Sequence, residues 1–246
     1  MEMLWSTCQN LHLPLKPGAS EEDLRRLEDR WGQPLPATLT TLLREHDGLD
    51  RSGWPADQFV PIRPLGTQEI ISALDQMDEV LESGEVLELS GLGLPVLEVD
   101  EGDFLVLFSD ATLGERVALW PMLSEVVELW FLNLHRFAAA WQNIQTDSQA
   151  FTYELFLDHP ATSGPLGDDA QVALDCLARA ELESQAGNAA RSRFYVDLAL
   201  QLWPQERALE MLSWPQVVEE PEAGWSPRER LLEIFEKRQL IHLLKS

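Results

Sequence analysis

The sequence predicts an α+β protein that ends in a helical extension. Apolar residues recur at helical spacing between residues 20 and 81. Short apolar runs rich in Val, Leu and Phe follow between residues 94 and 132, and helical spacing returns from residue 133. This order is typical of helices packed on a mainly antiparallel sheet. A polar stretch then divides the chain into an α+β domain, residues 1–149, and a helical extension, residues 150–246.

The first predicted helix lies between Ser20 and Gly32. Ser20 can accept a hydrogen bond from a free amide of the first turn, and Asp23, three positions later, forms an imperfect capping box with it. Gly32 supplies the left-handed residue that commonly ends a helix. Three apolar side chains recur at i, i+3 and i+7 and form one face: Leu24, Leu27 and Trp31.

Two more helices are predicted before the strands. One follows Pro36, which suits a first helical turn because its missing N–H costs nothing there, and this helix ends before Gly48. Its apolar face carries four side chains: Leu39, Leu42, Leu43 and His46. The next helix spans residues 67–81 and has an apolar face of its own: Ile70, Leu74, Met77 and Leu81.

The middle of the chain has the composition of strands. Residues 94–99 and 104–108 are short apolar runs, and residues 100–103 between them have the composition of a turn. The two runs are therefore predicted to form a β-hairpin. Residues 117–120 form a further predicted strand. Residues 126–132 fit a strand or a helix, since a short apolar run has no decisive period.

Helical periodicity dominates the rest of the chain. Apolar residues between 134 and 144 predict a helix that closes the α+β domain. Residues 169–186 and 189–203 predict a helical hairpin, because a Gly-Asn pair separates them and a proline follows the second run. Residues 227–244 predict one more amphipathic helix.

Composition and charge exclude several classes of protein. The 246 residues include 42 acidic and 18 basic side chains, which gives a net charge of −24 and a pI near 4.4. So acidic a chain lacks the basic surface that binds nucleic acid, and anionic membranes repel it. No apolar run reaches the roughly 18 residues of a membrane helix, and the N-terminus lacks the basic region of a signal peptide. We therefore expect a cytoplasmic protein.

The acidic residues are concentrated in one part of the chain. Residues 64–135 contain 15 acidic side chains and one basic side chain, Arg116, so this stretch carries a charge of −14. Self-repulsion on this scale opposes compactness, and a basic partner would relieve it through fast, salt-sensitive association. The alternative is that the charge serves only solubility.

No residue pattern predicts catalysis, a metal ion or a cofactor. His46 beside Asp47 resembles an acid–base pair, but a histidine at a helix C-terminus is favoured there by the helix dipole. The acidic residues of 100–103 lack the ligand spacing and distal glutamate of a calcium loop. Cys8 and Cys176 lie far apart and are not surrounded by the cations that activate a thiol. We therefore expect no catalytic residues, no metal ligands and no cofactor, and a chain that is not an enzyme.

Four sequence pieces within residues 1–145 occur in an order that is familiar from one family. They are Gly18-Ala19-Ser20-x-x-Asp23-Leu24-x-x-Leu27-Glu28, Leu35-Pro36 followed by Leu42-Leu43 and His46-Asp47-Gly48, Glu101-Gly102-Asp103-Phe104, and Asn133-Leu134-x-x-Phe137. In these pieces the chain resembles the SUKH superfamily, which includes the Smi/Knr cell-wall-assembly regulators of yeast and many bacterial proteins. The resemblance implies N-terminal helices on a mainly antiparallel sheet and no catalytic machinery. Bacterial members of this family are largely immunity proteins, which bind and neutralise toxins, so the resemblance also implies this function.

The expected function is therefore binding without catalysis. The resemblance and the charge predict an immunity protein that masks the active site of a basic partner, such as a secreted nuclease-type toxin. The residues expected to bind this partner are Glu82, Glu85, Glu88, Glu98, Asp100, Glu101 and Asp103. The alternative is a scaffold or regulatory adaptor, in the manner of the yeast relatives, that recruits partners through its helical C-terminal part.

Overall fold

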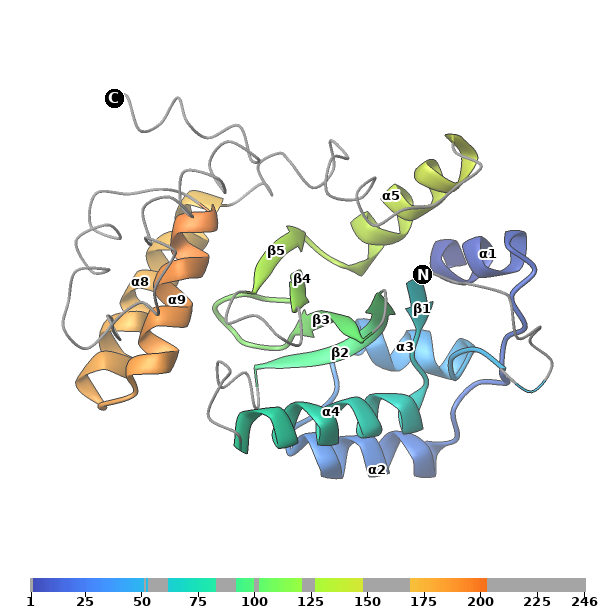
Figure 1. Ribbon diagram of the computed structural model, residues 1–246, viewed down its shortest axis with the longest axis horizontal. Coiled ribbons are helices and arrows are strands. Elements are labelled where there is room, and N and C mark those ends of the chain that lie inside the picture. The colour runs from blue at the N-terminus through green and yellow to red at the C-terminus, as the bar shows by residue number, and fades with distance from the viewer. Residues whose placement is uncertain are drawn as a thin grey trace.

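The computed structural model describes residues 2–50, 52, 62–82, 92–99, 102–120, 127–147 and 169–202. Within those residues the chain contains seven helices and one five-stranded sheet, which makes it an α+β protein as the sequence predicts. The sheet lies in the middle of the molecule, with helices on either side and a helical pair beyond one edge (Figure 1). None of the described helices is long and apolar enough to cross a membrane.

Four helices come from the N-terminal third of the chain. They are α1 (Glu2–Asn10), α2 (Glu21–Trp31), α3 (Ala37–Glu45) and α4 (Thr67–Glu82). The capping box of α2 is complete, because the Ser20 side chain accepts from the Asp23 amide and the Asp23 carboxylate accepts from the Ser20 amide. Gly32 ends α2 in the left-handed conformation, with φ 79°. The predicted bounds of α2 and α4 are thus confirmed to within a residue.

All neighbouring strands are antiparallel, and their order in the sheet follows their order in the sequence. They are β1 (Ile62–Pro64), β2 (Gly93–Val99), β3 (Asp103–Phe108), β4 (Val117–Trp120) and β5 (Glu128–Phe131). β2 and β3 form the predicted hairpin. β5 shows that residues 126–132, for which the sequence allowed either conformation, contain a strand.

Three helices follow the sheet in the described part of the chain. α5 (Leu134–Asp147) comes directly after β5, and α8 (Asp169–Gln185) and α9 (Ala189–Leu202) form a helical hairpin. The sequence predicts a helix at each of these places. The predicted helix at residues 227–244 lies outside the described residues, so a wholly helical extension stays a prediction.

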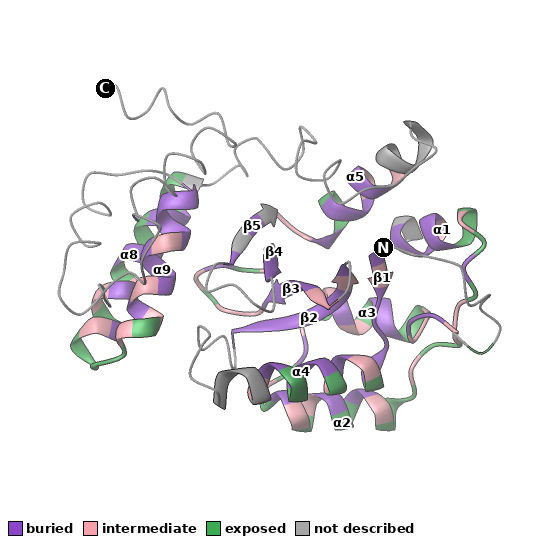
Figure 2. Cartoon of the chain, in the orientation of Figure 1, coloured by how far each residue is buried: buried purple, intermediate pink, exposed green. Residues whose placement is uncertain are grey.

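Helices cover the sheet, and apolar side chains fill the space between them. α2 and α4 lie side by side below the sheet in Figure 1, α1 lies beside α5 above it, and α9 lies beside β5. Figure 2 shows that the inner strands and α9 are buried along most of their length. The Phe108 ring of β3 lies 6.0 Å from the Phe194 ring of α9, so one apolar core continues from the sheet into the helical pair. The division at residue 150 stays a prediction.

Candidate partner-binding surface

The acidic residues predicted to bind a partner lie on and around the β2–β3 hairpin. Glu98 lies in β2 and Asp103 begins β3, and both side chains are half-buried. Glu82 is the last residue of α4. Four of the predicted residues lie outside the described part of the chain: Glu85, Glu88, Asp100 and Glu101.

The register of the hairpin separates the two acidic side chains that the structure places. Glu98 is opposite Phe104, and Asp103 is opposite Val99. Because side chains alternate between the faces of a sheet, Glu98 and Asp103 point to opposite faces. They therefore do not form one flat acidic patch. A partner that contacts both side chains has to reach both faces of the hairpin at its end.

Glu98 already has a basic neighbour. Strand β1 lies on the other side of β2 and places Arg63 directly opposite Glu98, and the two side chains form an ion pair. Their side chains are only 19% and 27% exposed, so this pair is shielded from salt better than a surface pair. Glu98 therefore contributes less to the outward field than its sequence position suggests.

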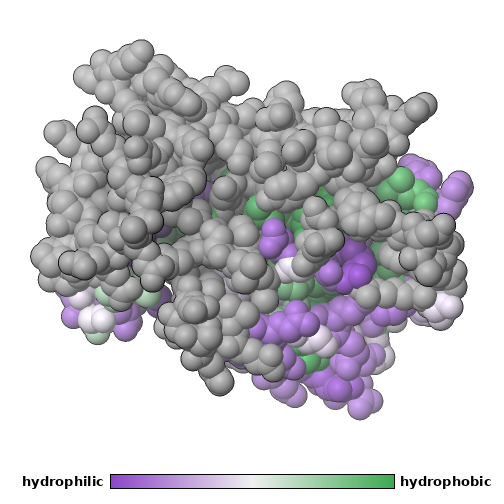
Figure 3. Space-filling view, in the orientation of Figure 1, coloured by the Kyte–Doolittle hydropathy of each residue, from purple (hydrophilic) through white to green (hydrophobic). Residues whose placement is uncertain are grey.

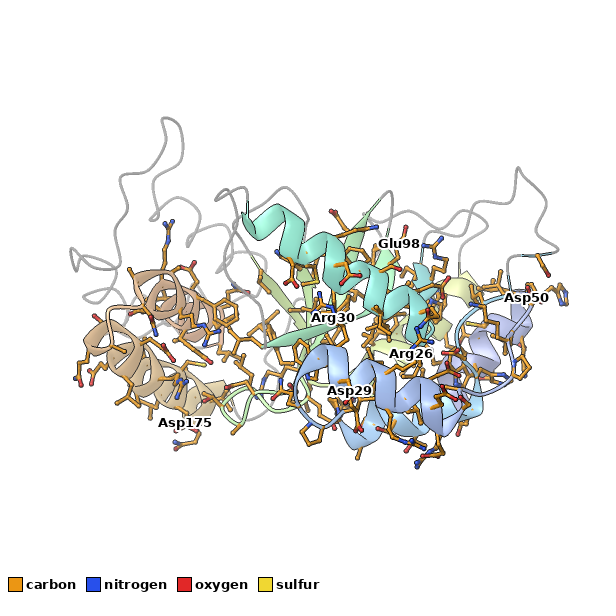
Figure 4. All side chains as sticks on the ribbon, turned by 90° about the horizontal axis from the view of Figure 1, so that it is seen from below. Arg26, Asp29, Arg30, Asp50, Glu98 and Asp175 are labelled. Atoms are coloured by element: carbon orange, nitrogen blue, oxygen red, sulfur yellow. The ribbon has the colours of Figure 1, made fainter. Side chains whose placement is uncertain are left out.

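The acidic residues of α4 are also partly neutralised. Arg30 projects from α2 between the two helices and bonds Asp75 at 2.8 Å and Asp78 at 2.6 Å (Figure 4). Lys16 lies 3.7 Å from Glu69 at the other end of α4. Hydrophilic side chains of both signs therefore gather over α2 and α4, at the bottom of the view in Figure 3.

The single basic residue of the acidic stretch is turned inward. Arg116 is 4% exposed and donates to the carbonyl oxygen of Leu113 at 2.8 Å. Residues 64–135 therefore present acidic but no lysine or arginine side chains to solvent. Among the described residues, the ion pairs that Glu69, Asp75, Asp78 and Glu98 form with Lys16, Arg30 and Arg63 bring cations from residues 1–63.

The neighbouring His46 and Asp47 have structural partners. The Asp47 carboxylate accepts hydrogen bonds from the Thr67 amide at 2.6 Å and the Thr67 hydroxyl at 3.1 Å, and so caps the start of α4. His46 is the C-cap of α3, and its Nδ1 donates to the carbonyl oxygen of Lys16 at 2.9 Å. Its ring lies edge-on to Trp5, with centroids 5.3 Å apart. These contacts give His46 and Asp47 structural roles at the ends of α3 and α4, which explain their presence without an acid–base function.

The two cysteines are free and buried. Desolvation raises the pKa of each thiol from 9.0 to about 12, so the reactive thiolate is scarce at neutral pH. Nowhere in the described ranges do three or more His, Cys, Asp or Glu side chains come together as a metal site would require. Of the acidic turn at 100–103, only Gly102 and Asp103 lie within those ranges.

The turn between β3 and β4 joins three parts of the fold, which the sequence did not reveal. On one side Gln33 donates to the Ser109 hydroxyl at 3.2 Å, and Thr38 donates to the Glu115 carboxylate. On the other side the Tyr195 hydroxyl of α9 donates to Asp110 at 3.2 Å. Burial, together with the nearby Asp110 charge, raises the pKa of Tyr195. The turn therefore ties the N-terminal helices to the C-terminal helical pair.

α8 presents the large apolar side chains that face solvent in the described residues. Leu174 and Leu182 are 47% and 57% exposed, and exposed Ala178 lies midway between them. The spacing of four residues places all three on one side of the helix. This stripe is the described surface best suited to an apolar contact.

A scan of the sequence against protein-family models finds no match, and a search of curated proteins finds none. The function is therefore inferred from this chain's own residues.

Proposed function

We propose that this chain is a SUKH-like, non-enzymatic binding protein that acts in the cytoplasm as an immunity protein, by covering the active site of a basic bacterial toxin. The observation that carries the proposal is the one-sided charge of residues 64–135, which contain 15 acidic side chains and a single, buried arginine. A surface of one sign speeds association with a partner of the opposite sign and selects against acidic proteins.

The SUKH resemblance is supported by the physical role of one of its sequence pieces. In His46-Asp47-Gly48 the aspartate caps α4, and the glycine has φ 79° and lies against Gly66. A short polar residue followed by glycine is what this junction requires. The order of helices, antiparallel strands and a closing helix also agrees with the resemblance.

The end of the β2–β3 hairpin is the proposed contact. Glu69, Asp75 and Asp78 of α4 and Glu98 of β2 have basic neighbours. The sequence of the turn adds three acidic residues within four consecutive positions: Asp100, Glu101 and Asp103. An acidic turn can enter a basic cleft that normally holds phosphate. Inhibition then follows from occlusion, and charge complementarity chooses the partner.

The test is a charge reversal that leaves the sheet intact. The variant replaces Asp100, Glu101 and Asp103 with lysine, and it keeps Glu98 because a lysine there would face Arg63 in a half-buried position. A control of equal charge change replaces three exposed acidic residues on α2 and α3 with lysine: Glu22, Asp29 and Glu45.

A pull-down from the source cell at low and high salt identifies the partner, and the purified partner is then titrated with each variant. We expect one basic, toxin-like protein that high salt releases. We expect the hairpin variant to weaken binding at least about tenfold, which is about 1.4 kcal/mol, and the control to bind nearly as the native chain does. Equal losses in the two variants would contradict the hairpin contact. Partners retained at any salt would contradict the electrostatic mechanism.

The exposed stripe on α8 favours a second candidate, a scaffold or regulatory adaptor that recruits a partner through its helical C-terminal part. Replacing Leu174 and Leu182 with glutamine removes the apolar contact at positions that are already half-exposed. An adaptor should then lose its partner, whereas an immunity protein that uses the hairpin should not. The same pull-down distinguishes the two functions.

A further inference from the structure

In the described part of the chain β5 is the last strand of the sheet, and its outer edge is occupied by a side chain. Gln201 of α9 accepts a hydrogen bond from the Leu129 amide through Oε1 and donates one to the Val127 carbonyl oxygen through Nε2, each at 2.8 Å. Gln201 is 2% exposed. An edge strand otherwise offers a row of unpaired N–H and C=O groups that another strand can use.

The two backbone groups that Gln201 engages are the ones an additional strand would take. They flank Glu128, and a parallel neighbour would donate to the carbonyl before that residue and accept from the amide after it. An antiparallel neighbour would use the same outward-facing groups of Val127 and Leu129. The amide of Gln201 thus stands in the place of one residue of a sixth strand.

The segment beneath this contact has the composition of a self-pairing strand. Residues 126–132 read Val-Val-Glu-Leu-Trp-Phe-Leu, with one charge, no proline and no glycine. Segments with high β-propensity and low charge associate edge to edge when they are exposed. The neighbours of Gln201 in α9 are fully buried leucines, Leu198, Leu200 and Leu202, so the glutamine is a polar exception in a buried apolar stretch.

We propose that the outer edge of β5 is a latent self-association site, which takes the same edge of a second copy of this chain, and that Gln201 keeps it closed. Two copies related by a twofold axis bring the two edges together antiparallel and extend one sheet into the next. The occupant is a second copy because residues 126–132 are nearly uncharged and self-complementary. The net charge of −24 opposes this association, so salt should strengthen it.

The test compares two buried positions on the same helix. Gln201→Leu keeps the size of the side chain but removes both bonds to β5. Ser192→Ala is the control, since Ser192 is also fully buried but donates to the Ala180 carbonyl oxygen of α8. Both variants loosen α9, and only the first removes the hydrogen bonds that occupy the strand edge. Light scattering over a concentration series, in low and in high salt, gives the association constant, and hydrogen exchange follows the Leu129 amide.

We expect Gln201→Leu to associate at least tenfold more strongly than Ser192→Ala, and more so in high salt. Its Leu129 amide should exchange rapidly at low concentration and become protected as the protein associates. A monomeric Gln201→Leu protein would overturn the proposal, and so would equal association of the control. If Gln201→Leu does not fold, the Gln201→Glu variant tests the proposal in its place. It keeps the acceptor for Leu129, loses the donor to Val127, and should still associate more strongly than the control.

Discussion

Two glycines with the same backbone conformation should respond very differently to alanine. Gly32 and Gly48 both have φ 79°, in the left-handed region where a side chain costs about 1–2 kcal/mol. A Cβ added at Gly32 meets no atom within 4 Å, whereas one added at Gly48 lies 2.5 Å from the amide nitrogen of Gly66. The pair therefore separates the cost of the conformation from the cost of the close approach.

The close approach at Gly48 belongs to the start of α4. Its carbonyl oxygen accepts from the Lys16 amide at 3.1 Å, and the preceding Asp47 caps α4 through Thr67. The nearest obstructing atom belongs to the backbone of Gly66, so a methyl group has to displace this junction. Overpacking costs about 1–3 kcal/mol and a weakened cap about 1 kcal/mol more. Alanine also stiffens the unfolded chain, which returns about 0.4–1 kcal/mol. The expected loss is about 3–5 kcal/mol for Gly48→Ala, against about 1 kcal/mol for Gly32→Ala.

Thermal and urea unfolding, followed by tryptophan fluorescence, measure both variants. In a chain of this size one kcal/mol corresponds to about 2–4 °C in Tm. Gly32→Ala should therefore lower Tm by about 2–4 °C and Gly48→Ala by at least about 6 °C. Equal losses would refute the reasoning, because the left-handed conformation alone would then account for both.

Three further outcomes follow from buried groups. The raised pKa of Cys8 and Cys176, about 12 against 9.0, means that neither thiol should react with a thiol reagent at pH 8 until the chain unfolds. Because the unfolded thiols ionise first, the stability that depends on the protonated thiols is intact below pH 9 and falls between pH 9 and 12. Tyr195→Phe removes the hydroxyl that bonds Asp110 and should cost about 1 kcal/mol in urea unfolding. An unchanged midpoint would show that this bond does not tie α9 to the turn.

The sequence predicts most accurately the elements whose ends are marked by their own capping or turn residues. α2 has a capping serine at one end and a left-handed glycine at the other, and both act as predicted. The β2–β3 hairpin has two short, nearly continuous apolar runs on either side of a turn with an acidic composition. In both cases the decisive contacts lie within a few residues along the chain, where local composition records them.

The missed elements depend on distant contacts. α1 has nine residues and is held by Trp5, whose indole nitrogen donates to the Leu42 carbonyl oxygen of α3 at 3.3 Å. β1 has three residues and pairs only with β2 in the described chain. A segment this short has no period to detect, so tertiary contacts alone define it. Gln201 did leave a signal, since a glutamine within an apolar helical run calls for a buried partner.

The acidic charge of the candidate surface could be predicted from the sequence, but the ion pairs that neutralise part of it could not. The concentration of acidic residues is visible in the sequence, but Arg30 meets Asp75 and Asp78 across 45 and 48 positions, and Arg63 meets Glu98 across 35. Only the fold brings these groups together. The register of the hairpin, likewise, is what sends Glu98 and Asp103 to opposite faces.

The placement of the cations bears on what the remaining acidic residues do. Lys16 comes from the segment between α1 and α2, Arg30 from α2 and Arg63 from β1, and each contacts acidic groups of α4 or β2. Solubility alone would be served by acidic residues spread anywhere on the surface. The cations instead meet acidic groups of α4 and β2, so the contact proposed for a basic partner is with the turn of residues 100–103, where the sequence adds three acidic residues. Salt then separates the two proposed associations, since it should weaken binding through the hairpin and strengthen pairing through β5.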